Sequence, residues 1–221
     1  MSKQARERIF ARLKSVAVTA ASPAPHPESL PQVAYSHQEK IEKLKTLMEA
    51  MRTEVHVTDA QNWIHTLEGI LKTRQLKNLV YPPETALGEA LQSHWDKDTG
   101  DLPQLIPYDT EIENFKERLF SIDAGITPVA GAIADPGALI LWPSDKEPRL
   151  ISLVPSIHIA VLKADTIFSS FLEAMQEEKW STKMPTNVVL ISGPSKTADI
   201  EMTLAFGVHG PRELIVLILE S

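Results

Sequence analysis

From Ser36 onward, short apolar segments alternate with stretches of helical period, and this alternation limits the possible folds more than any other feature of the chain. Ser36 to Glu39 has the pattern of a capping box, which predicts a helix to about Met51. Strand patterns follow at 54–58, 79–81 and 105–106. Helical patterns follow from the possible cap Asp59 to about residue 74, and over 84–95 and 111–120. This alternation predicts an α/β fold with a largely parallel sheet.

The second half of the chain is richer in strand patterns. Apolar runs at 129–134 and 138–142 flank Asp135-Pro136-Gly137, whose residue types predict the tight turn of a hairpin. Further apolar segments occupy 150–153, 157–162, 187–191 and 213–219, and Asp165 is placed to cap a helix to about Lys179. The complete pattern predicts a mixed sheet covered by helices.

The first 35 residues differ from the rest. Residues 2–16 have the pattern of a short amphipathic helix, and four prolines fall within the nine residues 23–31, where they exclude a regular helix. We therefore expect a helical arm at 1–18, a proline-rich linker at 19–35 and an α/β domain at 36–221. The arm either docks onto a partner or a second copy, or it lies on its own domain or frays.

Composition excludes several classes of function. The 221 residues carry a net charge of −7, which disfavours general nucleic-acid binding. There are no cysteines, so this chain has no disulfide, no thiolate zinc site and no thiolates for an iron–sulfur cluster. The longest apolar run, 214–219, is too short to span a membrane, and the basic N-terminus lacks the apolar centre of a signal peptide. A cytoplasmic protein is expected.

The segment most indicative of chemistry is 192–197, Ser-Gly-Pro-Ser-Lys-Thr, which follows an apolar strand pattern. We expect a helix to begin there, so that free backbone N–H groups, hydroxyl groups and the charge of Lys196 would bind a small phosphate or carboxylate. The candidate ligand residues are Ser192, Gly193, Ser195, Lys196 and Thr197. The alternative is that Ser195 or Thr197 only caps the helix.

Two histidines are weaker candidates. His209 lies in the glycine-rich segment 207–213 and has either a ligand-binding role or that of an ordinary loop residue. If the strands at 187–191 and 213–219 are parallel, the two turns lie at opposite sheet edges, and the length of the connection favours this arrangement. His158 is expected to be a half-buried strand residue facing a polar neighbour. No metal-binding spacing, serine-nucleophile elbow or dinucleotide loop is present, so no metal site is predicted and the catalytic residues stay unassigned.

These same segments resemble the lactate utilization protein C family, also called LutC/YkgG, which has a LUD domain. The C-terminal signature is formed by 191–201, Ile-Ser-Gly-Pro-Ser-Lys-Thr-Ala-Asp-Ile-Glu, with 207–212, Gly-Val-His-Gly-Pro-Arg. Segments 125–127, 134–139 and 149–160 are similar to the family as well. The resemblance is firm over 122–221 and loose over 36–121. One difference is Asp135-Pro136, where the family often has Glu followed by Thr or Ser.

The resemblance implies a three-layer α/β fold of the NagB/RpiA/CoA transferase-like type. It also implies a role in oxidising L-lactate to pyruvate beside iron–sulfur partner proteins, which would hold the clusters because this chain has no cysteine. Asp135 and Gly137 would then face the Ser192–Thr197 turn as a second wall of the ligand site. Two alternatives remain: an independent enzyme acting on a sugar phosphate, a folate or an acyl-coenzyme A, and a scaffold subunit whose pocket is vestigial.

Overall fold

The computed structural model describes residues 3–16, 33–95, 100, 102–109, 112–198, 204–207 and 209–220. The chain divides into two units, 1–32 and 33–221. The first unit contains α1 (Lys3–Val16), the helix that the sequence predicts, on which the Arg6 guanidinium lies 5.5 Å from the Phe10 ring centroid. Most of the proposed linker, residues 19–32, lies outside the described residues, and the three-part division remains a prediction.

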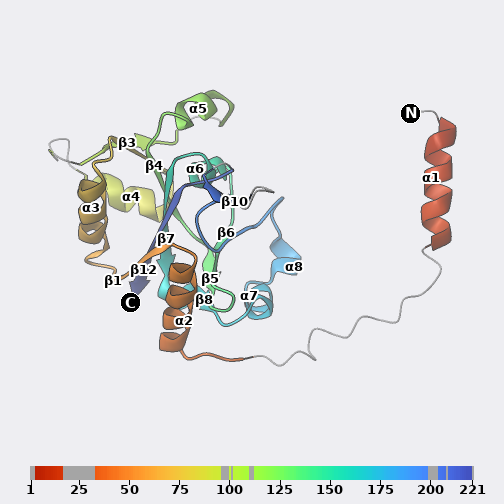
Figure 1. Ribbon diagram of the computed structural model, residues 1–221, viewed down its shortest axis with the longest axis horizontal. Coiled ribbons are helices and arrows are strands. Elements are labelled where there is room, and N and C mark those ends of the chain that lie inside the picture. The colour runs from red at the N-terminus through yellow and green to blue at the C-terminus, as the bar shows by residue number, and fades with distance from the viewer. Residues whose placement is uncertain are drawn as a thin grey trace. The chain divides into compact units, whose positions relative to one another are not determined.

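The second unit is built on a parallel sheet of six strands in the order β1-β12-β7-β4-β2-β3. Every neighbouring pair is parallel. The strands are β1 (Glu54–Asp59), β2 (Asn78–Tyr81), β3 (Gln104–Pro107), β4 (Ala124–Pro128), β7 (Ile157–Lys163) and β12 (Glu213–Glu220). β12 lies between β1 and β7, so the last strand of the chain completes the sheet begun by the first (Figure 1).

Helices cover both faces of this sheet. Successive apolar residues of the central strands β7 and β12 alternate between two large apolar clusters, as the two-residue period of a strand requires. One face packs against α3 (Trp63–Arg74) and α4 (Ala86–His94). The opposite face packs against α2 (His37–Ala50), α5 (Ile112–Leu119) and α6 (Leu150–Leu153), as well as against a second sheet. The predicted capping box of α2 is confirmed, with Ser36 and Glu39 each bonded to the other's backbone N–H.

The second sheet is mixed and has the order β8-β5-β6-β9. Its strands are β5 (Gly131–Ile133), β6 (Ala138–Leu141), β8 (Ile167–Phe168) and β9 (Val189–Ile191). One side of this sheet faces the apolar cluster that also contains α2 and residues of the central sheet. The other side packs on α7 (Phe171–Glu177) and α8 (Trp180–Lys183). A separate hairpin joins β10 (Lys196–Ala198) and β11 (Leu204–Phe206). The 3-10 turn η2 (Ala164–Thr166) connects β7 to β8.

The predicted α/β class is confirmed, and so is the antiparallel hairpin around Asp135-Pro136-Gly137. The mixed character is concentrated in the second sheet, whereas the central sheet is parallel throughout. The helix expected from Asp165 starts later, because residues 167–168 pair with β5 and the Ser170 side chain caps α7. Within the described ranges, no helix is long and apolar enough to cross a membrane.

The apolar segment at 150–153 adds no strand and forms the single turn α6. α6 lies directly against β4 at Gly125, where a Cβ would stand 2.3 Å from the Ile151 carbonyl oxygen. The glycine therefore permits a backbone approach that a side chain would prevent.

Candidate functional site

The turn at Ser192–Thr197 contains no helix N-terminus, so that part of the sequence prediction is wrong. After β9 the chain bends and continues into strand β10, which pairs with β11. The Ser195 N–H donates to the Pro211 carbonyl at 2.9 Å, and the Ser195 carbonyl accepts from the Gly207 N–H at 3.0 Å. These bonds hold the segment extended, and they occupy one of the N–H groups that an anion was expected to use.

The His209 turn lies against this segment, contrary to the arrangement that the sequence favoured. β9 and β12 belong to different sheets, so no parallel crossover separates the two turns. A Cβ built on Gly210 would stand 3.2 Å from the Ser195 Cβ, so the two backbones are in close contact. The structure thus brings His209 to the same surface as the Ser192–Thr197 turn.

Both turns carry side chains that can donate hydrogen bonds. Lys196, His209 and Arg212 are exposed, and Ser195 is half-buried. Gly207 has a φ of +74°, and a Cβ there would meet the Arg212 side chain at 2.2 Å, so the arginine stem lies across the glycine. Hydroxyl, ammonium, imidazole and guanidinium groups are the donors that bind a carboxylate or a phosphate.

The proposed second wall, Asp135 and Gly137, lies beside the start of this turn, because β6 pairs with β9 and sets Leu139 opposite Ile191. Gly137 has a φ of +80°, and its Cβ would stand 2.5 Å from the Leu47 Cβ on α2. Glycine is thus required there by the turn and by the close packing of α2.

Gly193 also faces α2, where a Cβ would stand 3.1 Å from the Met51 Cβ and carbonyl oxygen. The Asp135 carboxylate lies 3.4 Å from the Lys43 ammonium and accepts from the Tyr35 hydroxyl at 3.4 Å. Both glycines and the aspartate therefore have packing or pairing roles of their own, and ligand binding by these residues remains a prediction.

His158 is more deeply buried than the sequence suggested. It is fully enclosed on β7, and its Nε2 lies 2.9 Å from the Thr127 hydroxyl on neighbouring β4. Nδ1 has no hydrogen-bond partner among the described residues. Burial lowers the pKa of His158 to about 3, because the charged imidazolium would be separated from water. His158 is therefore a neutral side chain of the core.

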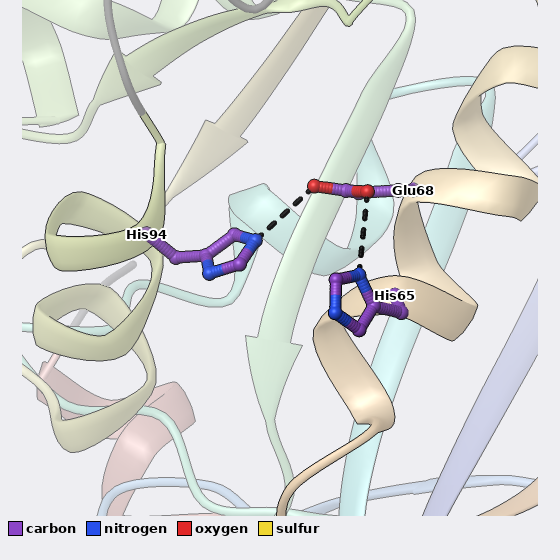
Figure 2. Close-up of side chains that lie close together, drawn as sticks. All are labelled: His65, Glu68 and His94. Atoms are coloured by element: carbon purple, nitrogen blue, oxygen red, sulfur yellow. Dashed lines mark hydrogen bonds and ion pairs between the residues drawn. The ribbon is translucent and has the colours of Figure 1, made fainter.

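Two further features escaped the sequence reasoning because their residues are distant along the chain. A pocket of about 240 Å³ lies over the outer side of the second sheet, with Trp142 and Trp180 in its lining and their ring centroids 5.4 Å apart. Its lining is mostly apolar, and the Glu178–Lys183 ion pair contributes its polar groups. The second feature is the histidine–carboxylate cluster of His65, Glu68 and His94, which joins α3 to α4 (Figure 2).

Comparison with known proteins places the chain in a family. Residues 41–219 match the LUD domain family, and the chain belongs to it. An uncharacterized protein of Neisseria meningitidis is 37% identical over 219 residues, which cover 96% of this chain and 92% of the relative. Lactate utilization protein C 1 of Bacillus mycoides is 28% identical over 191 residues, which cover 84% of this chain and 81% of the relative. The resemblance that the sequence motifs indicated is confirmed.

The fold has a counterpart among solved structures. The crystal structure of a DUF162 family protein from Deinococcus radiodurans superposes with a TM-score of 0.62 and covers 84% of this chain and 99% of its own. At 19% identity this similarity concerns the fold alone. It agrees with the helix-covered, mostly parallel sheet, whereas the more specific likeness to NagB/RpiA/CoA transferase-like proteins stays a prediction.

Proposed function

We propose that this protein is a cytoplasmic component of a system that oxidises L-lactate to pyruvate and that it acts together with iron–sulfur partner proteins. The observation that carries the proposal is the similarity to Lactate utilization protein C 1 along 84% of the chain. Shorter matches to proteins of the same name in other bacteria, such as 32% identity over 116 residues in Halalkalibacterium halodurans, support it.

The partners are proposed because lactate oxidation requires an electron acceptor and this chain has no cysteine to ligate a cluster. Iron–sulfur proteins bound to this subunit would receive the two electrons that leave lactate as it becomes pyruvate. In this arrangement the subunit supplies a binding surface, a ligand site or both.

The surface around Ser195, Lys196 and His209 is the proposed ligand site. L-Lactate and pyruvate both carry a carboxylate, which a lysine ammonium and a hydroxyl group bind by charge-assisted hydrogen bonds. The position of the site is consistent with this role, because Lys196 and His209 are exposed and two segments separated along the chain form it.

Deleting the gene from its source organism, in a strain with no other lactate oxidase, tests the proposal. The deletion strain should fail to grow on L-lactate and should grow normally on pyruvate. Complementation with the double variant Lys196→Gln/His209→Ala should restore growth only in part, because both side chains are exposed and their removal affects binding rather than folding. Equal growth of the deletion and parent strains on L-lactate would overturn the proposal.

Lys183→Gln is the matched control, since Lys183 is an exposed lysine that pairs with Glu178 away from the site. It should complement as well as the unmodified gene. Purifying the tagged protein from lactate-grown cells adds a second measurement. Iron-containing partner proteins should accompany it, and turnover of lactate by the isolated chain would contradict the assignment of electron transfer to the partners.

A further inference from the structure

His65, Glu68 and His94 form a three-residue cluster between α3 and α4. The His94 Nε2 lies 3.2 Å from Glu68 Oε1, and the His65 Nδ1 lies 3.6 Å from Glu68 Oε2. Figure 2 shows the carboxylate reaching toward both rings, one from each helix. Each carboxylate oxygen is thus paired with a nitrogen of a different histidine.

The folded core fixes the positions from which these side chains extend. His65 and Glu68 are three residues apart on α3, so they lie on one face of that helix. α3 is anchored by buried Leu67 and Leu71. His94 ends α4, which is held in turn by buried Leu87 and Leu91, and both helices pack on the same face of the central sheet.

The cluster combines one shielded ligand with two accessible ones. The Glu68 side chain is 20% exposed, whereas those of His94 and His65 are 39% and 69% exposed. The carboxylate is therefore held in place while the rings remain open to an ion from solvent. His94 also occupies the C-terminal turn of α4, where the helix dipole favours positive charge.

The donor set selects a class of metal. Two imidazole nitrogens and a carboxylate are a common zinc ligand set, and they leave a fourth position for water. The three ligand atoms lie within 4.8 Å of one another. A tetrahedral zinc site requires about 3.3 Å between donor atoms at bond lengths of about 2.0–2.1 Å. The His65 side chain, which is 69% exposed, has room to rotate toward this geometry. Mg²⁺ and Ca²⁺ prefer oxygen ligands, so the two imidazoles disfavour them.

We propose that His65, Glu68 and His94 bind one Zn²⁺ ion, which links α3 to α4. No spacing along the sequence reveals this site, because the third ligand lies on a different helix from the first two. The site lies on α3 and α4, the helices that cover one face of the central sheet, and the proposal does not depend on the role in lactate oxidation.

Zinc titration of the full chain tests this site directly. The protein should be freed of any polyhistidine tag, treated with a chelator, dialysed and titrated with zinc chloride by calorimetry near neutral pH. One zinc ion per chain should bind. His65→Ala should weaken binding by about tenfold or more, and this variant should fold normally because His65 is the most exposed of the three. His94→Ala and Glu68→Gln should have effects at least as large.

His56→Ala is the matched control. His56 also pairs with a carboxylate, Glu54, at 2.7 Å, but Arg74 occupies that same glutamate, and His56 belongs to no group of three possible ligands among the described residues. This variant should bind zinc as the unmodified chain does. Cobalt substitution should add the visible absorption of a nitrogen- and oxygen-ligated ion, and His65→Ala should remove it. Absence of stoichiometric binding, or equal weakening by His56→Ala and His65→Ala, would overturn the proposal.

Discussion

His158 and the cluster of His65, Glu68 and His94 show how differently one fold uses histidine. His158 lies on a central strand without solvent contact, beside the hydroxyl of Thr127. The cluster lies at the surface of two helices, where Glu68 reaches both of its histidines. A neutral hydroxyl accompanies the buried ring, whereas a carboxylate accompanies the exposed rings.

The difference follows from the free-energy cost of placing a positive charge in the core or at the surface. A buried imidazolium would lose its hydration without gaining an anion, so His158 stays neutral and its pKa falls to about 3. At the surface, water and the Glu68 carboxylate can both stabilise the positive charge of a bound metal ion. The burial of each histidine and the charge of its neighbouring group therefore decide where a positive charge can be accommodated.

Acid should destabilise the protein in part through His158. The pKa of His158 is about 6.5 in the unfolded chain and about 3 in the folded chain. Between these two pH values, the unfolded chain binds a proton at His158 and the folded chain does not. The stability linked to His158 is complete above the unfolded pKa and is lost as pH falls toward the folded pKa. The total loss is on the order of 5 kcal/mol.

Urea unfolding measured at several pH values between about 7 and 4 gives the dependence of the free energy of unfolding on pH. The double variant Thr127→Val/His158→Leu removes the titrating ring and the hydroxyl beside it together. Its free energy of unfolding should depend less steeply on pH than that of the unmodified chain. An unchanged slope in the double variant would show that other groups are responsible.

The contact between His158 and Thr127 should also be measurable at neutral pH. Thr127→Val keeps the side-chain shape but leaves the buried Nε2 without its hydrogen-bond partner, which should cost about 1–3 kcal/mol. His158→Leu leaves the Thr127 hydroxyl unpaired in the same way. Because the double variant leaves neither group unpaired, its destabilisation should be smaller than the sum of the two single values. Additive single effects would mean that the two side chains do not interact.

The sequence predicted local features well where one physical signal dominated. The capping box at Ser36, the hairpin at Asp135–Gly137 and the α/β alternation all depend on neighbouring residues, and all three are present. The helix expected after Ser195 does not form, because backbone groups from distant residues bind this segment instead. The bonds of Ser195 to Pro211 and Gly207 are made by residues well separated along the chain, and no local pattern reveals them.

The candidate sites show the same limit. The sequence indicated both signature turns but placed them apart, because it could not show that β9 and β12 belong to different sheets. Glycines that suggested ligand contact, Gly137 and Gly193, pack closely against α2. The cluster formed by Glu68 and His94 depends on how α3 and α4 are oriented on the sheet, which hydrophobic period alone does not determine.

Without metal, the exposed cluster should contribute little to stability. Glu68→Gln keeps the shape of the side chain and removes the charge that faces both histidines. Exposed pairs of this kind contribute about 0–1 kcal/mol, so the free energy of unfolding in the presence of a chelator should change by less than about 1 kcal/mol. Added zinc should raise the melting temperature of the unmodified chain and have little effect on the variant, since an ion bound only to the folded state stabilises it. A loss of several kcal/mol in chelator would instead make Glu68 a structural residue and remove the contrast with His158.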